Sequence, residues 1–149
     1  MRCLEQALTE VEERRNTMIK INELRIWNLV KIKTSNDAAY YPIYAIDAMR
    51  QKVILGGARE CEGWKDIDLL KPIPLTHELL ERTVFTFTHG GIGWHTYKMD
   101  NVILSVVPTN KSLLLGYPIN GNYRYIQYLH ELQNIYFSLT GKELEGEIC

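Results

Sequence analysis

The chain of 149 residues has few cysteines, no long hydrophobic run and no excess of charge of either sign. Its three cysteines, Cys3, Cys61 and Cys149, lie far apart and form no Cys-x-x-Cys pair, which excludes a zinc knuckle and a thioredoxin-type site. We expect all three to be reduced thiols of a cytoplasmic protein. No stretch of about 18 consecutive apolar residues occurs, so the sequence predicts no transmembrane helix.

The charge balance argues against a dedicated duplex-binding protein. Seventeen basic and eighteen acidic residues give a net charge of −1, whereas proteins held by phosphate contacts usually carry a basic excess. The best local candidates are Arg25, Lys31 and Lys33, which alternate with apolar residues as strand exteriors do. The N-terminus lacks the apolar centre of a signal peptide, so we expect a cytoplasmic location.

The first half predicts a helix followed by a small β-rich module. Residues 2–20 place apolar side chains at helical spacing, and this N-terminal helix or extension is assigned to residues 1–20. Short apolar segments separated by turns then predict strands at Leu24–Lys33, Tyr40–Ile46, Lys52–Leu55 and Trp64–Leu70. Such a pattern fits a small SH3-like β-barrel over residues 21–71, or alternatively a lone curled sheet.

The second half predicts an antiparallel meander covered by a C-terminal helix. Two alternating prolines keep residues 71–76 extended, and Thr76 then caps a short helix at His77–Arg82. Four strands follow, at Thr83–Thr88, Trp94–Met99, Val102–Val107 and Ser112–Ile119. The last helix is predicted at about Tyr123–Leu139, with Ile126, Leu129, Leu132, Tyr136 and Leu139 on one face and Gly141 as its C-terminal cap. The fold class is therefore α+β, with the second module at residues 72–149.

Three short blocks resemble a known group of proteins. They are Asn22–Ile26, Pro72–Thr76 and the tail from Leu132 to Leu144, in the same order along residues 18–145. The group consists of small uncharacterised proteins encoded by phages and prophages of gut bacteria, and in it the equivalent of Met18 is commonly the start. The resemblance implies a genomic setting in an infected or lysogenic bacterial host, and no activity or catalytic residue comes with it.

The glycine run Gly90–Gly93 is the first candidate for ligand binding. Gly91 and Gly93 would let backbone N–H groups approach an anion, with His95 and Trp94 beside them. However, the run lacks the Lys-Ser/Thr of a P-loop and a strand follows it, so a plain hairpin loop explains it as well.

No catalytic or metal set can be assembled from the sequence. The four histidines, His77, His89, His95 and His130, lack the spacing of a zinc motif, and surface or cap positions explain them more simply. His89 and His95 would approach across a hairpin, which leaves a phosphodiesterase-like site as a weaker alternative. No serine or cysteine has a recognisable catalytic partner. We therefore predict no catalytic residue, no metal and no cofactor.

The aromatic residues carry the strongest functional signal. Nine tyrosines and three tryptophans are many for this length, and such rings stack on bases and anchor interfaces as often as they fill cores. The stretch Tyr117–Tyr125 combines Tyr117, Tyr123 and Tyr125 with Arg124 at the predicted start of the last helix. A helix N-terminus, an arginine and stacking rings would suit a nucleotide or another anionic ligand.

These patterns predict a non-enzymatic binding protein, and the resemblance implies that it comes from a phage. It would counter host antiviral defence by sequestering a nucleotide-type signal or by blocking a host protein. We expect it to form a homo-oligomer and to have no membrane partner. The ligand-binding residues would be Tyr117, Tyr123, Arg124, Tyr125, Gly91, Gly93, Trp94 and His95. The alternative is a nucleic-acid-associated SH3-like module that uses Arg25, Lys31 and Lys33.

Overall fold

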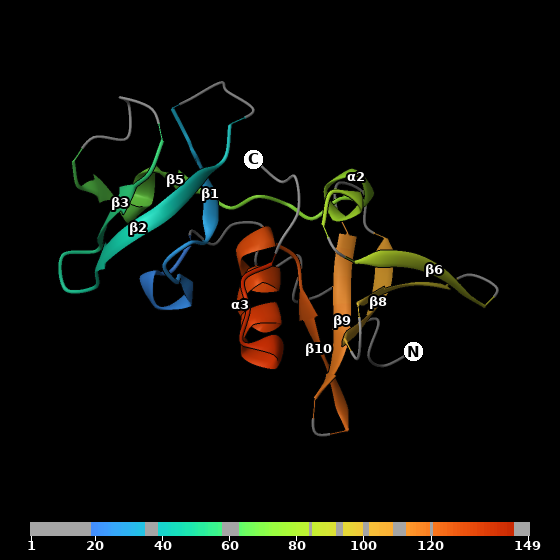
Figure 1. Ribbon diagram of the computed structural model, residues 1–149. Coiled ribbons are helices and arrows are strands. Elements are labelled where there is room, and N and C mark those ends of the chain that lie inside the picture. Colours follow the sequence, from blue (N-terminus) through green and yellow to red (C-terminus); the bar gives the residue numbers. More distant parts are fainter. Residues whose placement is uncertain are drawn as a thin grey trace.

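A computed structural model shows two antiparallel sheets with one helix between them (Figure 1). It describes residues 19–34, 39–57, 63–83, 85–91, 94–99, 102–108, 113–119 and 121–144. Nearly all of the predicted helix at residues 2–20 lies outside this part of the chain. The α+β class is confirmed, because both sheets are antiparallel and the helices are separate from them.

The first sheet has five short strands in the order β4-β3-β2-β1-β5. The chain enters it through a turn of 3₁₀ helix, η1, and a second such turn, η3, separates the last two strands. The elements are η1 (Ile21–Glu23), β1 (Leu29–Ile32), β2 (Tyr41–Asp47), β3 (Lys52–Leu55), β4 (Lys65–Asp66), η3 (Ile67–Leu69) and β5 (Leu70–Lys71). The edge strands β4 and β5 do not pair within the described residues, so the sheet is open and the predicted closed barrel is not seen.

Strand β1 is shorter than the predicted Leu24–Lys33 and contributes to two cores. Leu29 is buried in the core that α3 and the second sheet form, which we call the second core. Its neighbour Val30 is buried in the core of the first sheet, which we call the first core. Side chains that follow one another on a strand point to opposite faces, which is why one strand can contact both cores. β1 therefore links the two sheets through packing and not only through the chain.

The connector between the sheets keeps its predicted form. Ile73 and Leu75 are buried, and their main-chain groups form hydrogen bonds with Leu129, the first residue of the last helix, and with Gln127 just before it. Thr76 Oγ1 accepts a hydrogen bond from the Leu79 N–H at 3.1 Å, which confirms the predicted cap of α2 (His77–Glu81).

The second sheet has five strands in the order β10-β9-β8-β7-β6, one more than predicted. Its elements are β6 (Thr86–Gly91), β7 (Trp94–Met99), β8 (Val102–Pro108), β9 (Leu113–Ile119) and β10 (Asn122–Ile126), followed by α3 (Leu129–Thr140). The prediction that the last helix begins at Tyr123 is wrong, because residues 122–126 pair with β9 as a hairpin. Gly121 has a φ of 80°, a backbone conformation that suits the turn of such a hairpin.

Helix α3 packs one face against the second sheet and turns another toward the first (Figure 1). Leu129, Leu132 and Tyr136 belong to the second core, as predicted. Leu139 does not, because 58% of it is exposed. Gly141 ends the helix with a φ of 72°, and its N–H donates to the Phe137 carbonyl at 2.8 Å, which confirms the predicted cap.

Candidate functional site

A cleft of about 670 Å³ lies between the two sheets. Its walls are the segment at residues 22–25, the β9–β10 hairpin and the side of α3 that carries Glu131, Asn134 and Ser138. This volume is in the range of small-molecule sites, about 300–1,000 Å³. Of the eight residues predicted to bind a ligand, Tyr117, Arg124 and Tyr125 line this cleft.

The hairpin wall presents Tyr117 and Arg124 from one face of the second sheet. The two residues lie directly opposite each other in the β9–β10 register, so their side chains leave the same face. Tyr117 is buried, whereas Arg124 is exposed. Within the described ranges no carboxylate forms an ion pair with Arg124. Its guanidinium is therefore available to an anionic group, with five N–H donors in a planar arrangement.

Tyr123 and Tyr125 start from the other face of the hairpin. Their rings stack at a centroid distance of 6.4 Å and an angle of 27°. Gly116 lies opposite Tyr125, and a Cβ on this glycine would be 2.9 Å from the Tyr125 ring. The three tyrosines and Arg124 therefore do not form the single cluster at a helix N-terminus that the sequence predicts. Side chains alternate along a strand, so these residues are divided between two faces of the hairpin. Of the two tyrosines on the second face, Tyr125 borders the cleft and Tyr123 does not.

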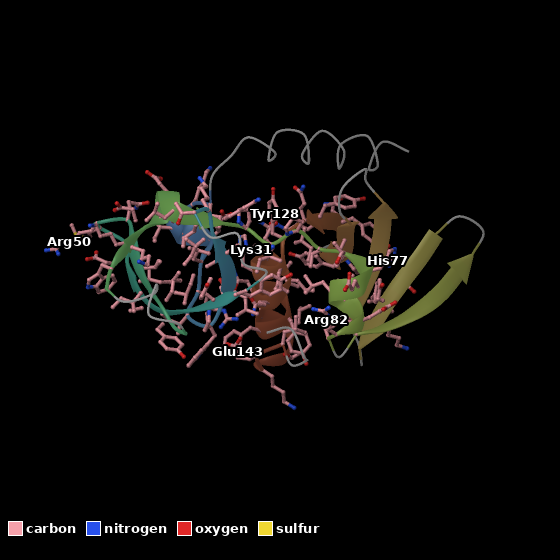
Figure 2. The ribbon with its side chains drawn as sticks, turned by 90° about the horizontal axis from the view of Figure 1, so that it is seen from above. Lys31, Arg50, His77, Arg82, Tyr128 and Glu143 are labelled. Atoms are coloured by element: carbon pink, nitrogen blue, oxygen red, sulfur yellow. The ribbon has the colours of Figure 1, made fainter. Side chains whose placement is uncertain are left out.

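The opposite wall is anchored by Arg25. Its guanidinium forms an ion pair with Glu143, donates from Nε to Asn134 Oδ1 at 3.2 Å, and lies 4.3 Å from the centre of the Phe137 ring. Figure 2 shows Glu143 on the side of α3 that faces the first sheet. The Arg25 side chain is 26% exposed. Arg25 thus joins the two sheets, in contrast to the prediction that it projects from a strand exterior toward a nucleic acid.

Buried amides continue this contact, and we call Arg25, Asn28, Gln133 and Asn134 the amide network. Asn28 is fully buried, and its Nδ2 donates to Asn134 Oδ1 at 2.8 Å. Gln133 Oε1 accepts the Leu29 N–H at 2.9 Å, and Asn134 Nδ2 donates to the Glu23 carbonyl at 2.8 Å. Buried polar groups need such partners, so the network fixes how the first sheet meets α3.

The two carboxylates of the cleft are partly engaged by the backbone. Glu131 Oε1 accepts the N–H groups of Gln127 and Tyr128, each at 3.2 Å, as a residue of a capping box does. Glu23 Oε1 accepts the Lys20 N–H at 2.7 Å. Glu23 thus keeps its second oxygen as an acceptor for a ligand hydroxyl or amine.

The glycine hairpin lies at the opposite corner of the second sheet. Gly91 ends β6 and Trp94 and His95 begin β7, whereas Gly93 lies outside the described residues. Since β6 and β10 are the two edges of the sheet, and the two hairpin turns are at opposite ends of its strands, this hairpin and Arg124 cannot share one small ligand. The residues predicted to bind a ligand are therefore divided between two distant parts of the second sheet.

The described histidines occupy structural positions. His77 is an exposed residue of α2, and its Nδ1 is 2.7 Å from the Tyr97 hydroxyl; Figure 2 places it over the second sheet. His130 is buried and stacks on Tyr128 at 6.0 Å. No three His, Cys, Asp or Glu side chains of the described part gather as metal ligands would. His89 and His95 lie opposite each other in the register of β6 and β7. The structure describes only the backbone of these two histidines.

The buried phenol of Tyr97 makes the stability of the fold depend on pH in the alkaline range. Burial, and secondarily the carboxylate of Glu81, raise the pKa of Tyr97 above its ordinary value of 10.0. The folded state then keeps a proton that the unfolded chain loses. The resulting stability is present below pH 10.0 and is lost as the pH rises through the folded pKa. Stability of the unmodified chain should fall more steeply above that pH than stability of Tyr97→Phe, measured by denaturant unfolding. If the stabilities of the two proteins fell in parallel with rising pH, the raised pKa of Tyr97 would be contradicted.

Sequence reasoning missed the amide network. Its residues are two asparagines, a glutamine and an arginine spread over more than a hundred positions, and none forms a motif. The available signal was the pair Gln133-Asn134 between Leu132 and Ile135, where two amides interrupt the apolar residues of the predicted helix and indicate a second, polar contact.

We compared the chain with protein families, curated proteins and solved structures. No family model, curated protein or solved structure matches the chain. No helix in the described part has the length and apolar character needed to cross a membrane.

Proposed function

We propose that this chain is a non-enzymatic, phage-encoded protein that binds a nucleotide-type ligand in the cleft and thereby withdraws a signal of host antiviral defence. The observation that carries the proposal is Arg124, an exposed arginine on the wall of the cleft with no ion pair to any described carboxylate. The phage setting rests on the resemblance of the three sequence blocks.

The lining of the cleft is complementary to a nucleotide. Arg124 would take a phosphate, because a guanidinium pairs with phosphate oxygens through two hydrogen bonds. Glu23 offers an acceptor for ribose hydroxyls, and Phe137, an exposed residue of the lining, offers aromatic surface for a base. Since the lining carries carboxylates as well as arginines, the ligand should combine an anionic group with hydroxyl or amine donors.

The same lining supports binding without chemistry. The hydroxyl of Ser138 donates to the Asn134 carbonyl at 2.9 Å, and no described histidine lines the cleft as its base. The second version of this proposal, in which the chain blocks a host protein, uses the same surface for a larger partner.

The experiment is a titration of the purified chain with cyclic oligonucleotides and ADP-ribose derivatives. Binding is measured as a shift of the melting temperature and as heat in a calorimeter. For a ligand that binds, we expect Arg124→Gln to raise Kd about 10- to 100-fold, because hydrogen bonds to a charged group contribute about 1.5–3 kcal/mol. Arg50→Gln is the matched control, since Arg50 lies at the far end of the first sheet (Figure 2). No shift with any of these ligands would remove the sequestration version.

A nucleic-acid-associated SH3-like module is the second candidate. The strand order β4-β3-β2-β1-β5, in which β5 returns to pair with β1 after the turn η3, supports the SH3-like interpretation. Lys31 pairs directly with Lys71 across β1 and β5, and its amine lies 5.4 Å from the centre of the Tyr40 ring. Arg25 does not support this function, because its N–H groups are bonded to Glu143 and Asn134 within the chain. A salt-dependent gel shift that is lost in Lys31→Glu with Lys71→Glu would favour this function.

A further inference from the structure

The cleft between the two sheets has a balanced set of charges. Four charged side chains line it: Glu23, Arg25, Arg124 and Glu131. No lysine or histidine of the described part is among the lining residues. Because two positive and two negative groups cancel, the cleft attracts an anion only where an arginine keeps N–H donors that the chain itself does not use.

Arg25 has no such donor left. Its Nε donates to Asn134 Oδ1 at 3.2 Å, and its Nη1 donates to the Ile26 carbonyl at 3.2 Å and to Glu143. Its Nη2 donates to Glu143 Oε2 at 3.0 Å and to the Gln133 carbonyl at 3.5 Å. These five hydrogen bonds are as many as a guanidinium has N–H groups, and Glu143 also balances its charge.

Arg124 is therefore the cation of the described lining that remains for a ligand. It is exposed, and no described carboxylate forms an ion pair with it. The two glutamates of the lining do not favour an anion. Glu131 accepts N–H groups at the start of α3, whereas Glu23 accepts the Lys20 N–H with one oxygen and keeps the other. A ligand thus meets one available cation and the negative charge of Glu23.

We propose that the cleft selects a nucleotide with a single phosphate group over nucleotides with two or more, an inference that rests on the proposed function. Arg124 can pair with the oxygens of one phosphate through two hydrogen bonds. A second phosphate would lose water without gaining a cation of the described lining, and Glu23 would repel it. Ribose hydroxyls differ from a second phosphate, because they can donate to Glu23.

This selection narrows the class of ligand. A cyclic oligonucleotide carries one phosphate for each nucleotide, and ADP-ribose carries two. Either can place one phosphate on Arg124, but the other gains no cation, so we expect weaker binding than for a mononucleotide of the same base. A cyclic mononucleotide is the best match. Its phosphate diester carries a single negative charge, whereas a phosphate monoester carries about 1.5 to 2 at pH 7.

The experiment is calorimetric titration of the full chain with nucleosides, cyclic mononucleotides, 5′-diphosphates and cyclic dinucleotides of each of the four bases. The buffer contains no divalent cation, because Mg²⁺ binds phosphates and would offset their charge. For the base that binds, we expect the cyclic mononucleotide to bind about tenfold or more tightly than the other three. Added salt should narrow the difference between one phosphate and two, because it screens the repulsion.

Glu23→Gln tests the source of the selection. The glutamine amide oxygen can still accept the Lys20 N–H and a ribose hydroxyl, so the main change is the loss of the charge. We expect the preference for one phosphate over two to shrink severalfold. Glu78→Gln is the matched control, since it makes the same change at an exposed residue of α2 that does not line the cleft. Its preference should equal that of the unmodified chain.

The possible failures are distinguishable. If a diphosphate or a cyclic dinucleotide bound as tightly as the cyclic mononucleotide, the inference would be overturned and the proposed function would stand. An unchanged preference in Glu23→Gln would also overturn it, because the repulsion would then have another source. If no nucleotide of any series bound, the proposed function would fail, and this inference with it.

Discussion

Leu132→Ala is expected to lower the free energy of unfolding by about 2–5 kcal/mol, because it removes a fully buried side chain and leaves a cavity. Leu132 is 0% exposed and lies in α3 among the residues of the second core. Tyr136 on the same helix and Leu115 on β9 surround the same region, so a cavity there weakens the contact between helix and sheet. Urea unfolding monitored by circular dichroism measures the change.

Leu139→Ala is the matched control for Leu132→Ala. It makes the same substitution on the same helix, but Leu139 is 58% exposed and should cost no more than about 0.5 kcal/mol. The sequence predicts that both leucines lie on the buried face, and then both variants would lose similar stability. The structure exposes Leu139, so only Leu132→Ala should lose much. Equal losses in the two variants would show that Leu139 is covered in solution.

The parts of the fold that sequence patterns predicted are those determined by local chemistry. Thr76 caps α2 and Gly141 ends α3, because a side-chain oxygen and a residue free to adopt positive φ satisfy the helix ends wherever they occur. Residues 122–126 were mistaken for helix, since tyrosines and an arginine in a short segment suit either structure. Pairing with β9, a tertiary contact, decides for the strand.

The candidate site was predictable only in part for a related reason. Arg124 and Tyr117 were chosen for their chemistry, and the structure places both on the cleft. The same chemistry favours Gly91 and His95, but they belong to β6 and β7, and β8 and β9 separate these strands from β10. Arg25 shows the converse, since its partner Glu143 is 118 residues away and no local pattern indicates their contact.

The shape of the cleft depends on how the two sheets meet. One wall belongs to the segment before β1 and the other to the β9–β10 hairpin, and α3 lies between them. Leu29 packs into the second core, and the amide network lies beside it. A change in this contact should therefore alter stability and ligand binding together, even where the altered residue touches no ligand.

Gln133→Ala tests this coupling and is expected to lower the free energy of unfolding by about 1–3 kcal/mol. Gln133 is 4% exposed, and its removal leaves the buried Leu29 N–H without the acceptor at 2.9 Å. Because that N–H belongs to β1 and Gln133 to α3, the loss falls on the contact between the sheets. For a ligand that binds the unmodified chain, we expect weaker binding, since the wall at residues 22–25 loses part of its support.

Ser138→Ala distinguishes this effect from a general loss of helix stability. Ser138 is exposed on the same helix, and its hydroxyl donates to the Asn134 carbonyl within α3. Its replacement should change the free energy of unfolding by less than about 0.5 kcal/mol. If Gln133→Ala behaved like Ser138→Ala, the amide network would not hold the sheets together. If it lowered stability but left ligand affinity unchanged, the cleft would not depend on that contact, and the ligand would be held by the hairpin wall and α3 alone.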